Sequence, residues 1–486
     1  MQDSKKKKSM SFRRAAALQF GSRYLNVFLQ LILTAILARL LSPNDYGIMA
    51  GISIFTNFFG ILADMGFGPA IVQYKNLTSK DYGSLFIFSL CLGVSLAGIF
   101  MALGYPIAWF FHESAYIRLC AWSSISIFFS TIDMVANGIL LKEKRFDLIG
   151  SRLVVTTLIG GTVAVSMAIS GFGTMSLIWN INTISILVFC WNFTSIRRKI
   201  SFSEIHILDS IRIVARYSSY QAGFGFVNYF SRNLDHLIIG RISGSAPLGL
   251  YDKAYKLTSY PIQFVPGVLG TIIQPFLSMY QDKKEKLFEA QSKMISVLAL
   301  IGSVATFIFL LCGTEIIYFA YGSQWMQCVP LFTILSLSIT FQMVNNITGS
   351  ILQSAGRTDY LFAQGIFATL IMVVFVLLGA ITENLYVVTS MVTAAFILQT
   401  ITVAYFTTVK TFSHNINSFF NPIAFPFITS FICFLPLAGI KYYLNFLTNN
   451  YFLSLIFYAF TYVILDSTVL LVTGQLKVLK SLLKNN

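Results

Sequence analysis

The sequence contains few charged residues: only 11% of its 486 residues are Asp, Glu, Lys or Arg, whereas 56% are hydrophobic. A soluble domain is typically about one-quarter charged, so this chain lacks the charge needed to cover a surface that faces water. The composition therefore indicates an integral membrane protein surrounded by membrane lipids. It excludes a cytosolic enzyme, a secreted disulfide scaffold and a nucleic-acid-binding domain, and we expect no nucleic-acid partner.

Motifs for cofactors and catalysis are also missing. The six cysteines are scattered without a CxxC pair, and we interpret them as small apolar packing residues. The sequence has no Walker A, GxSxG or HExxH pattern and no spacing typical of metal ligands. We therefore expect no cofactor, no metal and no covalent chemistry, and predict that the protein is not an enzyme.

Long apolar runs make up most of the chain. A helix that spans a membrane needs roughly 20 mainly apolar residues, and the runs are too long and continuous for the strands of a β-barrel. We predict an all-α polytopic membrane protein with about fourteen transmembrane helices. They are expected near residues 15–41, 46–73, 82–111, 115–141, 148–170, 174–196, 212–240, 247–279, 288–318, 326–354, 360–381, 385–409, 420–443 and 452–473.

The charges in the connecting loops support this count. If the N-terminus is cytoplasmic, every inner loop carries Lys or Arg and the outer loops carry none, as the positive-inside rule requires. The net charge of +15 is then mostly explained by topology. We expect a multi-pass protein of the cytoplasmic membrane with both termini in the cytoplasm.

An internal repeat divides the chain. Charged residues and glycines recur at offsets of 202 and 212, as in Arg39 with Arg241, Gly47 with Gly249, Arg145 with Arg357, and Asp147 with Asp359. Such repeats are common in transporters built from two bundles around a central site. We predict two parallel six-helix bundles around a central cavity: residues 1–196, a cytoplasmic linker 197–211, residues 212–409, and two additional helices with a basic tail in 410–486.

Basic residues within the apolar runs are costly to bury and predict a polar interior. The predicted helices 1, 7 and 8 contain four of them, and together they predict a cationic cavity suited to phosphate or pyrophosphate: Arg23, Arg232, Lys253 and Lys256. Lys253 and Lys256 are three residues apart and can share a helix face, and Asp252, four residues before Lys256, can pair with it. The alternative is that these residues form interhelical salt bridges or extend to the membrane surface.

Acidic residues within the apolar runs suggest gating or ion coupling, or else structural hydrogen bonds and helix caps. The candidates are Asp64, Asp133, Asp235, Asp252 and Glu315. His236 follows Asp235 directly and is a weaker candidate for proton transfer. Three tyrosines near the basic residues are positioned to stack on sugar rings: Tyr24, Tyr251 and Tyr255.

Several stretches resemble the Wzx/PST-type polysaccharide flippases of the multidrug/oligosaccharidyl-lipid/polysaccharide exporter superfamily. They are Ile36–Gly47 (ILARLLSPNDYG), Asp64–Gln73 (DMGFGPAIVQ), Gly171–Gly173, Leu237–Arg241 and Leu248–Ala254 (LGLYDKA). The pattern is most similar to the branch that includes colanic-acid and teichuronic-acid exporters.

The resemblance implies that the chain flips undecaprenyl-pyrophosphate-linked oligosaccharide repeat units across the cytoplasmic membrane by alternating access. By helix position, it assigns the pyrophosphate to the four basic residues. It further implies a monomer that works with a polysaccharide polymerase and assembly machinery.

Two other functions are compatible with parts of the sequence. A multidrug exporter of the same superfamily typically has twelve helices and acidic groups in its cavity. A membrane-embedded glycan-assembly enzyme, such as a glycosyltransferase or polymerase, would predict a long loop with clustered carboxylates or arginines, and no loop here is long.

Overall fold

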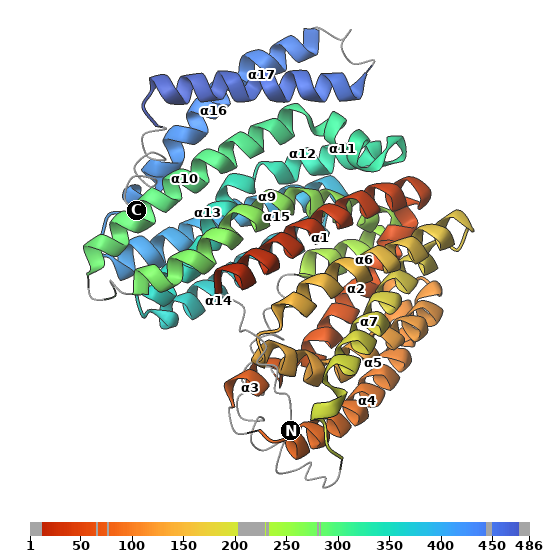
Figure 1. The fold of residues 1–486 in the computed structure, drawn as a ribbon. Helices are drawn as coiled ribbons and strands as arrows, with labels where there is room; N and C mark the ends of the chain where they lie inside the picture. The colour runs from red at the N-terminus through yellow and green to blue at the C-terminus, as the bar shows by residue number, and fades with distance from the viewer. Residues whose placement is uncertain are drawn as a thin grey trace. The chain divides into compact units, whose positions relative to one another are not determined.

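The computed structural model describes residues 12–64, 67–74, 77–202, 229, 233–278, 281, 283–443 and 450–475. These residues form helices and short connections without a β-strand, which confirms the all-α prediction. Within the described ranges, eleven helices are long and apolar enough to cross a membrane, or twelve if one bent pair counts as a single span. The predicted number of fourteen is therefore not confirmed. The predicted span 212–240 lies mostly outside the described residues. The predicted span 247–279 corresponds to the helix Ser245–Ser278, labelled α9 in Figure 1, whose sequence contains three charged residues.

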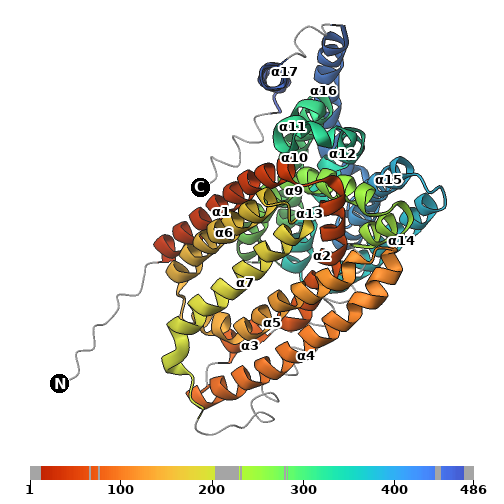
Figure 2. The same ribbon diagram turned by 90° about the vertical axis from the view of Figure 1, so that its right-hand side faces the viewer.

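Residues Met1–Phe230 form the first compact unit. Its elements are α1 (Phe12–Leu40), α2 (Pro43–Asp64), α3 (Phe67–Gln73), α4 (Ser79–Phe111), α5 (Ala115–Lys142), α6 (Phe146–Ile169), α7 (Thr174–Ile196) and the short η1 (Arg197–Lys199). In this unit α1 packs along α6, and α5 packs along both α4 and α7 (Figure 2). An apolar cluster that includes Ile71, Leu85, Val135, Ile139 and Ile196 joins α3, α4, α5 and the end of α7.

Residues Ser231–Asn486 form the second compact unit. After a helical segment over residues 233–243, its elements are α9 (Ser245–Ser278), α10 (Lys284–Leu311), α11 (Gly313–Tyr321), η2 (Ser323–Cys328), α12 (Val329–Ser336), α13 (Ile339–Ser354), α14 (Thr358–Ala380), α15 (Leu385–Ala404), η3 (Tyr405–Thr411), α16 (Asn417–Tyr443) and α17 (Tyr451–Val472). Helix α13 packs against both α9 and α10, and α16 packs along α10. The two additional C-terminal helices, α16 and α17, belong to this unit.

Three of the predicted spans are interrupted. The span 46–73 is divided between α2 and α3, and the span 288–318 is interrupted at Cys312, between α10 and α11. The span 326–354 becomes α12 and α13, and the axis that runs from η2 and α12 into α13 bends by 55°. A continuous apolar run does not reveal such breaks, because residues on both sides of a bend remain equally apolar.

The predicted repeat appears as two turns of the same geometry, one before α6 and one before α14. In each turn a residue with positive φ, Lys144 (55°) or Gly356 (69°), ends the preceding helix. The next residue, Arg145 or Arg357, donates its backbone N–H to the carbonyl five residues earlier, at 3.0 Å and 2.9 Å. This is the Schellman arrangement that closes a helix C-terminus. Each arginine then donates two hydrogen bonds, from Nε and Nη2, to the two carboxylate oxygens of the aspartate two residues later.

Candidate functional site

A tight helical hairpin in the second unit gathers ionisable side chains. The helical segment 233–243 ends at Gly244, whose φ of 88° is unfavourable for residues with a side chain. Helix α9 starts directly afterwards, and Pro247 lies in its first turn, where the missing N–H costs nothing. The chain therefore reverses direction within a few residues. The reversal brings Asp235 and His236 beside the first turns of α9.

Asp235 is the most enclosed carboxylate of this hairpin, with 3% of its surface exposed. One of its oxygens accepts a hydrogen bond from the Tyr251 hydroxyl at 2.7 Å. The other accepts the backbone N–H of His236 at 2.8 Å and lies 3.0 Å from the His236 ring nitrogen Nδ1. Both oxygens of this buried carboxylate are thus paired, as burial of a charged group requires.

His236 connects Asp235 to a second carboxylate, Asp252. The second ring nitrogen of His236, Nε2, lies 3.6 Å from Asp252 Oδ1. The rings of Tyr251 and Tyr255 meet the imidazole edge-on, with centroids 5.1 Å and 5.4 Å away. The imidazole is therefore held between two carboxylates and two aromatic rings, and 8% of the residue is exposed.

Lys256 forms the exposed end of this chain of contacts. Its ammonium lies 2.8 Å from Asp252 Oδ2, and the pair is four residues apart on α9, as the sequence predicted. The Lys256 side chain is 54% exposed, whereas that of Asp252 is 7% exposed. We call Tyr251, Asp235, His236, Asp252 and Lys256 the α9 network. It extends from a buried carboxylate to a cation that faces outward.

Lys253 follows Asp252 in the chain, and its ammonium packs against two aromatic rings. Its ammonium is 5.0 Å from the ring centroid of Tyr321 and 5.8 Å from that of Trp325, and 2% of the residue is exposed. Such cation–π contacts compensate in part for the lost hydration of a buried ammonium. The structure therefore separates Lys253, buried against α11 and η2, from Lys256, which is exposed.

Two basic candidates remain, Arg23 and Arg232. Arg23 is exposed on α1 in the first unit, and Arg232 lies outside the described residues. The prediction that Arg23, Arg232, Lys253 and Lys256 line one cavity stays a prediction. Tyr251 is fully buried with its hydroxyl on Asp235, so the expectation that this ring stacks on a sugar is wrong in this conformation.

Two of the other acidic candidates have partners within their own unit. Asp133 is buried on α5 and accepts two hydrogen bonds from the Asn192 side chain on α7, at 2.7 Å and 3.0 Å. Glu315 on α11 binds the Lys441 ammonium on α16 at 2.7 Å and the Ser454 hydroxyl on α17 at 2.8 Å. These contacts join helices within a unit. A role for Asp133 or Glu315 in gating or ion coupling stays a prediction.

Asp64 is the last residue of α2, and its side chain lies outside the described part.

The sequence reasoning missed the partners Asn192, Lys441 and Ser454, because each lies more than fifty residues from the carboxylate it binds. Within the described residues, no group of three or more His, Cys, Asp or Glu side chains is arranged to hold a metal ion.

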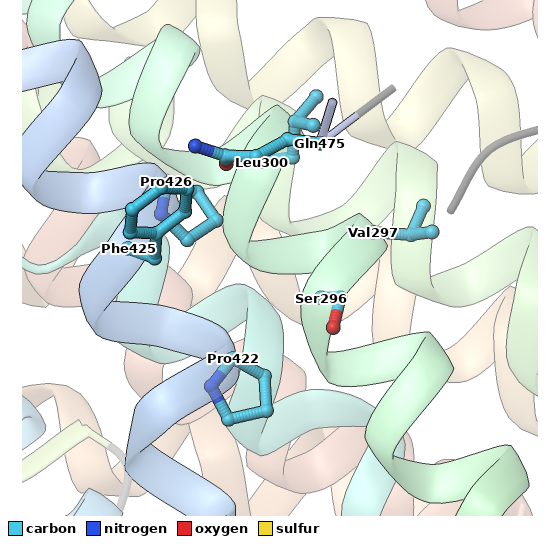
Figure 3. Close-up of a pocket in the computed structure, with 7 residues that line it drawn as sticks. All are labelled: Ser296, Val297, Leu300, Pro422, Phe425, Pro426 and Gln475. Carbon is cyan, nitrogen blue, oxygen red and sulfur yellow. The ribbon is translucent and has the colours of Figure 1, made fainter. Parts of the chain in front are cut away.

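A hollow of about 140 Å³ lies between α10 and α16 in the second unit. Figure 3 shows Ser296, Val297 and Leu300 from α10 on one side and Pro422, Phe425 and Pro426 from α16 on the other, with Gln475 beside them. None of these residues carries a charge. The hollow therefore offers no ionic partner to an anionic group, unlike Lys256 on α9.

Comparisons with known sequences match this chain to one protein family and to several relatives. The family described as "Polysaccharide biosynthesis protein" matches residues 36–330, which is more than half of the chain. The lipopolysaccharide biosynthesis protein WzxC of Escherichia coli (strain K12) is 22% identical over 359 residues, covering 72% of this chain and 71% of that protein. The teichuronic acid biosynthesis protein TuaB of Bacillus subtilis (strain 168) is 21% identical over 339 residues, covering 69% of each.

Solved structures show the same fold. The lipid II flippase MurJ, in an inward closed conformation, superposes with a TM-score of 0.68 at 14% identity and covers 94% of this chain and 98% of its own. An inward-facing multidrug resistance transporter of the MATE family and MOP superfamily superposes with a TM-score of 0.60 at 15% identity. The match covers 84% of this chain and 99% of that transporter. Because both identities are low, the similarity concerns the fold alone.

Proposed function

We propose that this chain, which belongs to the polysaccharide biosynthesis protein family, flips undecaprenyl-pyrophosphate-linked oligosaccharides across the cytoplasmic membrane. The main support is the family match over residues 36–330 on a fold shared with a lipid II flippase. Relatives named for polysaccharide biosynthesis and transport agree with this function, among them the succinoglycan biosynthesis transport protein ExoT of Rhizobium meliloti (strain 1021), 24% identical over 316 residues.

In this proposal the protein works by alternating access between two bundles, with both chain termini in the cytoplasm. Basic residues hold the pyrophosphate while the isoprenoid tail remains in the lipid. Lys256 is the described candidate with the best geometry for this role, because half of its side chain is exposed and its ammonium is carried on a flexible four-carbon stem. We expect the protein to act as a monomer and to deliver its product to a polymerase and assembly machinery.

The exposed lysine provides the first test. Lys256→Gln removes the charge but keeps a polar side chain of similar length, so we expect at least a tenfold loss of surface polysaccharide in a host that lacks the native gene, since a charge-assisted contact is worth about 1.5–3 kcal/mol. The matched control is Lys284→Gln, an exposed lysine at the start of α10. Surface polysaccharide and the amount of protein in the membrane are measured in both strains.

Three results would contradict the proposal. One is normal surface polysaccharide in the deletion host itself. Another is equal export by the Lys256→Gln and Lys284→Gln strains at equal protein levels, which would show that Lys256 does not bind the pyrophosphate. A deletion host that instead becomes sensitive to cationic drugs, with unchanged polysaccharide, would favour the multidrug-exporter alternative.

A further inference from the structure

We propose that His236 is a proton-binding site whose occupancy is linked to what Lys256 binds. The inference rests on the proposed function for the identity of the anion, and on the α9 network for the proton. Its starting point is that both ring nitrogens of His236 face carboxylate oxygens: Nδ1 is 3.0 Å from Asp235, and Nε2 is 3.6 Å from Asp252.

The geometry favours a protonated imidazole. A neutral ring has one N–H donor and one lone pair, whereas the imidazolium donates from both nitrogens. With a neutral ring, the lone pair of one nitrogen would point at an anionic carboxylate oxygen. Water could do little to screen this contact, because only 8% of His236 is exposed. With a protonated ring, an N–H faces each carboxylate, in a hydrogen bond to Asp235 at 3.0 Å and in a charge contact with Asp252 at 3.6 Å.

Among the described residues, the elements that pack against α9 bring no further acidic or basic side chain to His236. Helices α12, α13 and α15 and the η2 turn contain no Asp, Glu, Lys, Arg or His. Helix α10 carries its charged residues at Lys284–Lys293, next to the far end of α9. On the hairpin itself the groups that face His236 are Asp235, Asp252, Tyr251 and Tyr255, with Lys256 reaching Asp252. Lys253 points toward Tyr321 and Trp325, and Arg232 lies outside the described residues.

The link to the substrate follows from the way Asp252 is shared. Its Oδ2 faces the Lys256 ammonium and its Oδ1 faces the His236 ring. When Lys256 moves outward to a diphosphate, Asp252 stays buried and loses its nearest cation. A protonated His236 then supplies the positive charge that Asp252 needs. The proton therefore strengthens diphosphate binding, and by reciprocity the diphosphate strengthens proton binding.

The first experiment measures how binding of the lipid depends on pH. Purified protein in detergent is titrated with undecaprenyl diphosphate between pH 6 and pH 9. We expect the affinity to fall by about tenfold per pH unit above the pH at which His236 loses its proton. His236→Gln cannot carry the proton and should show only the slope that comes from the lipid phosphates. The matched control, His112→Asn at the exposed C-terminus of α4, should keep the wild-type profile.

The second experiment detects the proton without any ligand. Nitrogen NMR of ¹⁵N-histidine-labelled protein, with the His236 signal assigned by its loss in His236→Gln, reports the protonation of the ring. We expect a protonated ring at pH 7 in the wild type. In Lys256→Gln, where Asp252 has lost its ammonium, the ring should keep its proton to higher pH. This variant changes an exposed side chain and leaves the buried carboxylates and imidazole in place.

The two experiments separate the possible failures. A neutral His236 ring at pH 7 would overturn the inference whatever the protein binds, as would a pH profile in His236→Gln equal to that of the wild type. A His236 ring that is protonated at pH 7, and that keeps its proton to higher pH in Lys256→Gln, supports a proton-binding site at His236. If the same protein binds undecaprenyl diphosphate at no pH, the proposed function fails, and with it the link to that anion.

Discussion

The ion pair between Glu315 and Lys441 should hold the two C-terminal helices against the rest of the second unit. Glu315 on α11 is 2% exposed and binds both Lys441 on α16 and Ser454 on α17. Lys441→Met keeps the length of the side chain and removes its charge. The carboxylate is then left with the Ser454 hydroxyl as its remaining partner among these contacts.

The magnitude follows from the distance and the burial. At the observed 2.7 Å, the attraction between the two charges is about 6 kcal/mol for an effective dielectric constant near 20. Removing one partner of a buried pair typically costs about 3–5 kcal/mol, because the other charge is left without compensation. One-fifth of the Lys441 side chain is exposed, so we take the lower end, about 3 kcal/mol.

The protein's own cysteines provide the assay. Cys433 on α16 is buried within the apolar cluster that packs α16 and α17 on α10, and Cys120 is buried on α5 in the first unit. In backgrounds that keep only one of these thiols, the maleimide labelling rate reports how often each region opens. A loss of 3 kcal/mol should accelerate the labelling of Cys433 by about a hundredfold. The labelling of Cys120 should not change.

The double variant Glu315→Gln with Lys441→Met is the control for buried charge. It removes both charges while the Gln oxygen still accepts from Ser454, so Cys433 should be labelled within about tenfold of the wild-type rate. Equal labelling of Cys433 in Lys441→Met and wild type would refute the reasoning. A parallel acceleration at Cys120 would also refute it, because the effect would then be global.

Two further predictions concern packing and the repeated turns. Gly83→Ala on α4 places a methyl group against the backbone carbonyl oxygen of Ser201 and should lower the melting temperature in detergent, at a cost of about 1–3 kcal/mol; Gly98→Ala on the same helix meets no atom within 4 Å and should not. Equal melting temperatures of these two variants would contradict this packing. Arg357→Ala breaks the exposed pair with Asp359 and should leave the melting temperature unchanged, because exposed ion pairs contribute little; a clear loss would show that the turn depends on the pair.

Features that depend on neighbouring residues could be predicted from the sequence. The apolar run 174–196 matches α7, and the run 452–473 matches α17 within one residue at each end. The pair of Asp252 and Lys256 was predicted from its i, i+4 spacing and is confirmed. These features follow from helix periodicity alone.

Features that depend on packing between distant segments could not be predicted. Glu315 and Lys441 are 126 residues apart, and Asp133 and Asn192 are 59 apart, so no local spacing indicates either pair. Lys253 and Lys256 lie three residues apart and were expected on one helix face. Their exposure differs because the aromatic rings of Tyr321 and Trp325 cover Lys253, and the position of those rings relative to α9 depends on tertiary packing.

Transport of a lipid diphosphate by the purified protein tests the proposed function most directly. The lipid-linked oligosaccharide that accumulates in the deletion host is extracted and reconstituted with the protein in liposomes, and its exchange between leaflets is followed by access of an external sugar-modifying enzyme. We expect fast exchange with the wild type and at least tenfold slower exchange with Lys256→Gln. Exchange at the rate of protein-free liposomes, or no accumulated lipid-linked oligosaccharide in the deletion host, would contradict the proposal.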